Sequence, residues 1–186
     1  MHPDFEFHIY PKHLLKGKSI TDENADVITK IGLPGFVSPH LYFGDFEEEQ
    51  FLPLLSNWSW ASEWEGNINV AMQHFPDCLV IGAGQESEPI IIKPNDSSLY
   101  QVNMDGKSLK LINENLDKLF LTLDAFLDMV DKVHSNDSNA FLEQRVNPLL
   151  VSLFKTQLKN IDPLALGKNS FWEQLADNCS LHHKNV

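Results

Sequence analysis

The segment of the chain most suggestive of chemistry is a glycine-containing loop between two apolar runs. Leu79-Val-Ile-Gly82-Ala-Gly84 precedes Gln-Glu-Ser-Glu, and Pro89-Ile-Ile-Ile-Lys93 follows. Many nucleotide sites begin with a strand and Gly-x-Gly, because the backbone can then approach a pyrophosphate at a helix N-terminus. Here Ser87 stands where the third glycine belongs, and another apolar run follows in place of a helix. The loop therefore predicts a turn between two strands, whose glycines relieve a twisted strand end and supply a positive φ.

Other residue types that act in catalysis or metal binding lack a productive spacing. The eight histidines form no HExxH pair, and His182-His183 stand near the chain end. Cys78, at the head of an apolar strand, is typical of a small packed hydrophobe and not of an activated nucleophile. Neither a GxSxG elbow nor a Gly-Lys-Ser/Thr phosphate loop occurs. We therefore expect that the protein is not an enzyme and has no catalytic residues, metal site or cofactor.

Acidic and aromatic residues instead indicate a surface for a partner. The acidic candidates lie after Gly44 and in the glycine loop: Asp45, Glu47, Glu48, Glu49, Glu86 and Glu88. Acidic runs are also typical of plain solvated surface. Three tryptophans fall within seven residues, at Trp58, Trp60 and Trp64. They could pack in the core, anchor an interface with a cationic partner, or stack on a sugar.

The middle of the chain holds the elements that would position these candidates. Turn residues and β-branched runs predict four strands, at residues 78–83, 89–93, 98–103 and 109–112. Their connections are too short for crossover helices, and Asp105-Gly106 is typical of a hairpin turn, so we expect an antiparallel meander. A short helix near residues 25–31 and a short strand at 41–43 are predicted before it.

Three helices are predicted after the meander. Asn113 would cap a helix of about five turns with an apolar face made of Leu116, Leu119, Phe120, Leu123, Phe126, Leu127 and Val130. Asn147 would cap a second helix, whose apolar side comprises Val146, Leu149, Leu150, Leu153, Phe154 and Leu158. Residues 171–175 predict a short third helix. Strands followed by helices, without a linker, indicate a single α+β domain over residues 1–186, with a central, mostly antiparallel sheet backed by helices.

Composition limits the classes of function. The chain has 26 acidic and 14 basic residues, a formal charge of −12, so nucleic acid and anionic membranes are not expected as partners. No run approaches the roughly 20 apolar residues that span a bilayer, and the amino terminus lacks a signal-peptide core. Cys78 and Cys179 form no disulfide framework. These features together favour a cytoplasmic location.

Three stretches resemble the SUKH superfamily of Smi/Knr-like proteins, most closely its fourth immunity branch. The first is Ile31-Gly-Leu-Pro34 with Pro39-His-Leu-Tyr-Phe43. The second is Leu79-Val-Ile-Gly82 with the two strands after it, and the third is Leu111-Ile-Asn113 leading into a long helix. The end of the chain, residues 161–166 and Phe171-Trp172, is also similar to that branch. The resemblance covers residues 31–175, leaving 1–30 as an N-terminal extension and 176–186 as a frayed tail.

The resemblance implies a function as well as an α+β fold. Members of this kind are non-catalytic immunity proteins that bind and neutralise a cognate bacterial toxin domain, often a nuclease or a deaminase, inside the producing cell. An acidic chain suits a basic toxin, because opposite charges steer association. We place the contacts at the acidic and tryptophan candidates. The alternatives are a Smi/Knr-type regulatory or scaffolding protein that binds host proteins, and a small-ligand-binding protein.

Overall fold

The structure, a computed structural model, describes residues 6–37, 41–44, 52–58, 64–141 and 143–181. The chain divides into two compact units, residues 4–110 (the N-terminal unit) and residues 111–186 (the C-terminal unit). Helices and antiparallel strands both contribute, so the predicted α+β class is confirmed. That the whole chain acts as one domain stays a prediction.

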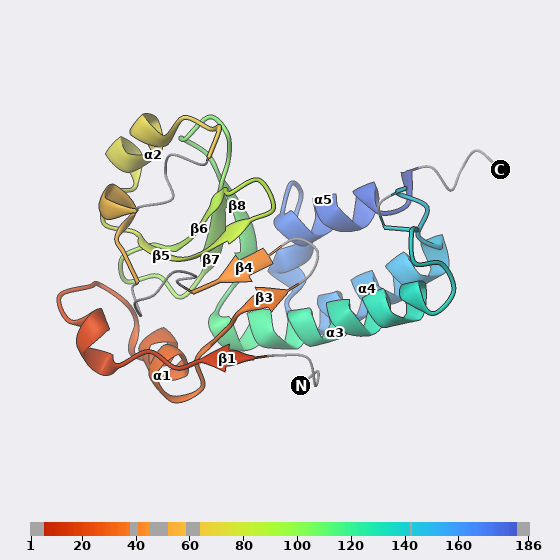
Figure 1. The fold of residues 1–186 in the computed structure, drawn as a ribbon, viewed down its shortest axis with the longest axis horizontal. Coiled ribbons are helices and arrows are strands. Elements are labelled where there is room, and N and C mark those ends of the chain that lie inside the picture. Colours follow the sequence, from red (N-terminus) through yellow and green to blue (C-terminus); the bar gives the residue numbers. More distant parts are fainter. Residues whose placement is uncertain (1–5, 38–40, 45–51, 59–63, 142, 182–186) are drawn as a thin grey trace. The chain divides into compact units, whose positions relative to one another are not determined.

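A six-stranded antiparallel sheet, in the order β3-β4-β5-β6-β7-β8, organises the N-terminal unit (Figure 1). Its strands are β3 (Phe36–Val37), β4 (Leu41–Phe43), β5 (Leu79–Gly84), β6 (Pro89–Ile92), β7 (Leu99–Val102) and β8 (Leu109–Asn113). The unit boundary falls within β8. A separate antiparallel pair joins β1 (Phe7–His8) to β2 (Leu33–Pro34). The strands β5 to β8 confirm the predicted meander, and β4 confirms the predicted strand before it.

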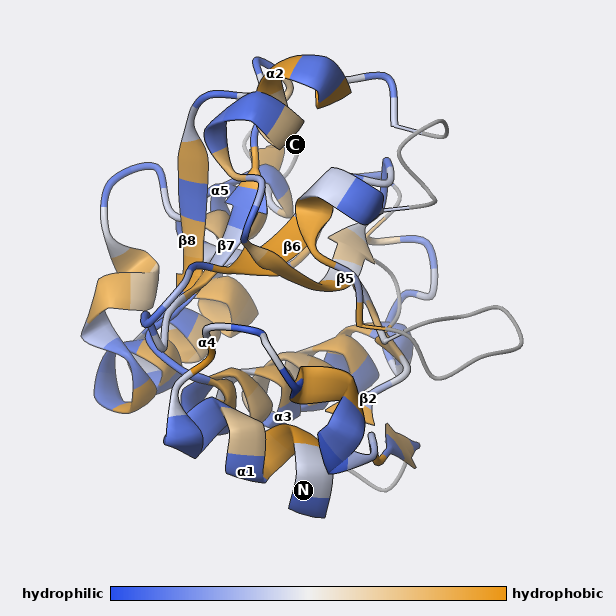
Figure 2. Cartoon of the chain, turned by 90° about the vertical axis from the view of Figure 1, so that its left-hand side faces the viewer, coloured by the Kyte–Doolittle hydropathy of each residue, from blue (hydrophilic) through white to orange (hydrophobic). Residues whose placement is uncertain are grey.

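The central strands β5 and β6 are buried at every position. They pair with Leu79 opposite Ile92 and Val80 opposite Ile91, and the register shifts between Val80 and Gly82. Figure 2 shows both strands coloured as hydrophobic along most of their length. Burial on both faces explains why these strands appear in the sequence as uninterrupted apolar runs, because neither face has to meet water.

The helices of the N-terminal unit are short. α1 (Asp22–Lys30) begins at Thr21, whose side chain accepts a hydrogen bond from the Asn24 backbone, and it matches the helix predicted near residues 25–31. α2 (Ile68–His74), which the sequence analysis missed, begins at Asn67. The described part of this unit also contains the 3-10 turns η1 (Lys12–Leu15) and η2 (Leu55–Asn57). Residues from η2, α2 and the sheet form one core cluster: Leu55, Trp58, Trp64, Ala71, Cys78, Val80, Ala83, Ile91 and Val102.

The C-terminal unit is helical, with α3 (Leu116–His134), α4 (Pro148–Ile161), the 3-10 turn η4 (Pro163–Leu166) and α5 (Phe171–Asn178). The predicted apolar face of α3 is confirmed, since all its residues are buried except Leu127, which is half-buried. The Asn147 cap of α4 is also confirmed: its side-chain oxygen accepts from the Leu149 N–H at 2.9 Å. Residues 176–178, which we expected in a frayed tail, belong to α5.

The prediction that Asn113 caps α3 was wrong. Asn115 caps the helix by accepting from the Lys118 N–H at 2.8 Å. Asn113 is instead fully buried; its amide donates to Asp162 Oδ2 at 2.9 Å and to Thr122 Oγ1 at 3.1 Å. Its carbonyl oxygen accepts from the indole N–H of Trp172 at 3.0 Å. This buried network ties the end of β8 to α3, α5 and the residue after α4.

The predicted apolar side of α4 was partly wrong. Of the predicted residues, Val146, Phe154 and Leu158 are buried, whereas Leu149 and Leu153 are 65% and 53% exposed. Val151, which was not in the predicted set, is also buried. A helix advances about 100° per residue, so the apolar residues of α4 cover a wider arc than one core-facing stripe. Only the half of that arc around Phe154 meets the core, where its ring lies 5.9 Å from Phe126 and 5.8 Å from Trp172 between centroids.

Candidate contact surface

The glycine loop that carries Glu86 and Glu88 is a hairpin turn. β5 and β6 pair antiparallel, with Ala83 opposite Pro89, so no helix N-terminus faces the Gly-x-Gly segment. The positive φ that we expected at the glycines occurs instead at Ser87, with φ of 62°. Gly82 is required for a different reason: a Cβ there would collide with the carbonyl oxygen of Tyr42 on β4. The glycines therefore serve close strand packing and not phosphate binding.

Glu86 and Glu88 have different environments in that loop. Glu86 is exposed and Glu88 is half-buried. The Glu88 carboxylate accepts from the Glu86 backbone N–H at 3.0 Å, so it holds the turn together. Burial lowers the pKa of Lys110, and the negative charge of Glu88 opposes that shift. Glu86 is thus the residue of the pair with a carboxylate directed to solvent and available to a partner.

For two of the three tryptophans, the structure decides between packing in the core and lying on a contact surface. Trp58 and Trp64 are only 7% and 4% exposed, and both belong to the core cluster of the N-terminal unit. The packing alternative therefore describes them, and they leave little surface for a partner. Their large apolar area fills the space between the sheet, η2 and α2.

The remaining candidates fall on parts of the chain that are not described. Asp45, Glu47, Glu48, Glu49 and Trp60 lie outside the described residues. Their role as partner contacts stays a prediction.

Charge is divided unevenly between the units. Residues 4–110 contain 16 acidic and 7 basic residues, a formal charge of −9, whereas residues 111–186 contain 10 and 7, a formal charge of −3. All six acidic candidates belong to the N-terminal unit. This unit therefore has the stronger attraction for a cationic partner.

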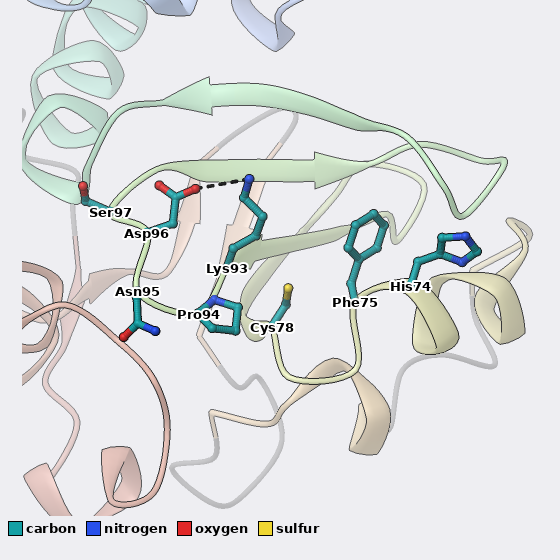
Figure 3. A pocket seen from close by; sticks show the side chains of 8 residues that line it. All are labelled: His74, Phe75, Cys78, Lys93, Pro94, Asn95, Asp96 and Ser97. Atoms are coloured by element: carbon teal, nitrogen blue, oxygen red, sulfur yellow. Dashed lines mark ion pairs between the residues drawn. The ribbon is translucent and has the colours of Figure 1, made fainter.

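A hollow of about 680 Å³ opens in the N-terminal unit, between the end of α2, the start of β5 and the loop after β6 (Figure 3). Its lining consists of His74, Phe75, Cys78, Lys93, Pro94, Asn95, Asp96 and Ser97. In Figure 3 the Lys93 side chain reaches across the loop to the Asp96 carboxylate. The composition of residues 94–97, Pro-Asn-Asp-Ser, is typical of a turn, and nothing in the sequence predicted a hollow there.

The charged groups of this hollow satisfy one another. Lys93 Nζ lies 3.2 Å from Asp96 Oδ2 and 4.4 Å from the centre of the Tyr100 ring. The Tyr100 hydroxyl and the Ser98 N–H also donate to Asp96. Burial alone would raise the pKa of Asp96, but the hydrogen bonds from Ser98 and Lys93 outweigh it and lower the pKa. Asp96 is therefore a paired anion and lacks the proton that a general acid must deliver at neutral pH.

The thiol and the imidazole beside the hollow also lack an arrangement that would activate them for catalysis. Burial raises the pKa of the Cys78 thiol to about 11, so the thiol keeps its proton at neutral pH and is a weak nucleophile. The Nδ1 atom of His74 lies at hydrogen-bonding distance, 2.9 Å, from the carbonyl oxygen of Val70. Within the described residues, no three His, Cys, Asp or Glu side chains are grouped so that they could hold a metal ion. Over the same residues, no helix combines the length and the apolar character that crossing a membrane requires.

The chain is acidic and its fold is of the α+β class. The family follows from comparison: the sequence profile of the SUKH-4 immunity protein family matches residues 9–178, so the chain belongs to that family. The resemblance to the fourth immunity branch is thereby confirmed, and the match begins 22 residues before the first motif that carried it. The family indicates an immunity function and a protein partner, and its members are generally non-catalytic. No curated protein and no solved structure matches the chain.

Proposed function

We propose that the protein binds a cognate bacterial toxin domain and neutralises it in the cytoplasm of the cell that makes both. Membership of the SUKH-4 immunity protein family supports the class of function. The formal charge of −9 on residues 4–110 is the observation that carries the specific form of the proposal, which is a basic toxin such as a nuclease or a deaminase acting on nucleic acid.

The physical reason is electrostatic steering. An enzyme that acts on nucleic acid must attract phosphates and therefore tends to be basic. A complementary acidic inhibitor associates at up to about 10⁸–10⁹ M⁻¹s⁻¹ at low salt, fast enough to capture the toxin before it reaches its substrate. Inhibition is stoichiometric, and no bond is made or broken.

The proposed contacts are the acidic candidates Asp45, Glu47, Glu48, Glu49, Glu86 and Glu88, together with Trp60. Glu86 has the best structural support, because it is exposed while Glu88 holds the turn. Trp58 and Trp64 are left out because the core covers them.

The experiment that tests the function is co-expression with the product of the neighbouring open reading frame, as the candidate toxin, followed by co-purification and calorimetric titration. We expect a one-to-one complex whose affinity falls as salt rises. Glu86→Lys should weaken the complex by about tenfold or more, mainly through slower association. Asp128→Lys is the matched control, since it reverses an exposed charge on α3 and changes the net charge equally.

Each outcome of this titration has a consequence. Equal losses in the two variants would mean that net charge alone matters and would remove Glu86 from the contact surface. Failure of the toxin to bind, with a host protein retained instead, would favour the Smi/Knr-type regulatory or scaffolding alternative. Stabilisation by a nucleotide or sugar in a thermal-shift screen would favour the small-ligand alternative.

A further inference from the structure

Three polar residues lie next to one another on the sheet of the N-terminal unit. Glu88 lies in the turn between β5 and β6, Gln101 on β7 and Lys110 on β8. The Asn103 N–H donates to the Ser108 carbonyl, and this antiparallel register, continued along the two strands, places Gln101 opposite Lys110. Figure 2 shows hydrophilic stretches of β7 and β8 beside the hydrophobic β6. Glu88, Gln101 and Lys110 are called the polar triad below.

Gln101 is the buried member of the polar triad, and its side chain lacks a partner. The residue is only 4% exposed, and its side-chain amide forms no hydrogen bond with any other residue that the structure describes. The amide is not among the unpaired polar atoms that are sealed from solvent, so its end is still accessible. A buried amide without a hydrogen bond destabilises a fold. Its presence here indicates a partner from outside the chain.

The absence of a side chain at Gly84 makes room for this amide. A Cβ at Gly84 would collide with both Gln101 Nε2 and Glu88 Oε2, so these two side-chain ends lie against the bare backbone of β5. Glu88 Oε2 accepts from the Glu86 N–H. Within the described part of the chain, no donor reaches Glu88 Oε1. The half-buried carboxylate therefore holds the turn with one oxygen and keeps the other for a ligand.

The two charges of the polar triad are opposite and yet not paired. Lys110 is half-buried, and its ammonium forms no ion pair with a described residue. Burial lowers the pKa of Lys110, and the charge of Glu88 acts against that shift, so the two groups feel each other without direct contact. A guanidinium that entered would be repelled by Lys110, and a carboxylate would be repelled by Glu88. Charge therefore selects a neutral group that both donates and accepts hydrogen bonds.

We propose that the polar triad binds the side-chain carboxamide of an asparagine or a glutamine on the protein partner. The proposal rests on the proposed function in one respect, that the partner is a protein. A primary carboxamide has two N–H donors and one carbonyl acceptor. The donors suit Glu88 Oε1 and Gln101 Oε1, and the carbonyl suits Lys110 and Gln101 Nε2. A main-chain peptide group has a single N–H and would leave one of these acceptors unpaired.

The chemistry is tested with propionamide, which has the carboxamide alone, so the toxin need not be identified. Propionamide is titrated into the ¹⁵N-labelled full chain, and two-dimensional NMR follows the side-chain N–H₂ signal of Gln101 and the backbone amides of Glu88 and Lys110. Saturable shifts are expected at all three residues. N,N-dimethylpropionamide, which has no N–H, and propionate, which is charged, should give shifts at least about fivefold smaller at the same concentration.

Gln101→Leu separates recognition from a structural role. Leucine has a similar volume and removes a polar group that has no partner in the fold, so the melting temperature should stay the same or rise. The variant should lose the propionamide shifts at the backbone amides of Glu88 and Lys110, and it should bind the toxin about tenfold more weakly. Gln73→Leu is the matched control, because Gln73 is exposed on α2 outside the polar triad; neither measurement should change.

Each result bears on the proposal. A clear fall in the melting temperature of Gln101→Leu would show that the fold itself uses the amide and would overturn it. Equal shifts with N,N-dimethylpropionamide or propionate, or equal losses in Gln73→Leu, would overturn it as well. If the toxin binds Gln101→Leu as tightly as the original chain, the polar triad is not its contact, while the proposed function stands. Propionamide shifts that Gln101→Leu removes, without any toxin complex, would support the polar triad and contradict the proposed function.

Discussion

The buried network around Asn113 allows a quantitative test against its neighbour Asn115. Asn113→Ala removes the hydrogen bonds to Asp162, Thr122 and Trp172, and each partner is itself fully buried. Asn115→Ala removes a helix cap. The two substitutions delete the same atoms from residues two positions apart. The difference between their effects on the unfolding free energy therefore reports the difference between the two environments.

The magnitudes follow from the contacts. A stranded indole N–H costs about 1–3 kcal/mol, and a buried carboxylate that loses one of its donors costs about 1.5–3 kcal/mol. Asp162 keeps the Glu114 N–H as a donor to Oδ2, while its Oδ1 has no hydrogen-bond partner among the described residues. We therefore expect Asn113→Ala to cost about 3–5 kcal/mol of unfolding free energy, against about 1 kcal/mol for Asn115→Ala.

Urea denaturation followed by circular dichroism measures both values. With about 2–4 °C per kcal/mol for a chain of this size, the melting temperature should fall by roughly 6–20 °C for Asn113→Ala and by only a few degrees for Asn115→Ala. The urea m-value should not change, which would show that the unfolded states are comparable. If Asn115→Ala lowered the unfolding free energy as much as Asn113→Ala or more, the assignment of Asn113 to the buried network would be refuted.

Two further predictions concern the N-terminal core and the thiols. Gly82→Ala should lower the unfolding free energy by about 3 kcal/mol, because the added Cβ meets the Tyr42 carbonyl oxygen. Gly17→Ala, in open space at φ of 79°, should lower it by only about 1 kcal/mol. Equal losses in urea titrations would contradict the steric explanation. Burial raises the pKa of Cys78 and Cys179 from 9.0 to about 11, so the unfolded thiols lose their protons first as pH rises. Their contribution to stability should be intact below pH 9 and should be lost between pH 9 and 11, and a Cys78→Ala, Cys179→Ala chain should lack this part of the pH dependence. An unchanged pH profile in that variant would contradict it.

Local patterns predicted the meander and the helices because these elements depend on near neighbours in sequence. The β5–β6 connection is too short for anything but a turn, and Asn147-Pro148 begins α4 through a cap and a ring already set for helical φ. α2 was missed because its seven residues are too few for a helical period to be recognised.

The contact surface was harder to predict, since exposure is not a local property. The same aromatic and acidic spacing is compatible with a core and with an interface, and Trp58 and Trp64 proved to be core. Leu149 and Leu153 show the opposite error, because the apolar residues of α4 suggested packing where the structure leaves two leucines uncovered.

The sequence by itself determined the acidic character, the β5–β8 meander with the helices that follow it, and the family, because composition, periodicity and motifs are properties of the chain alone. Tertiary structure decided which asparagine caps α3, which tryptophans are buried and which leucines face solvent. Those outcomes depend on residues far apart along the chain: Asn113 takes partners 49 and 59 positions away, at Asp162 and Trp172. No local pattern encodes such pairings, because they arise only when separate elements pack together.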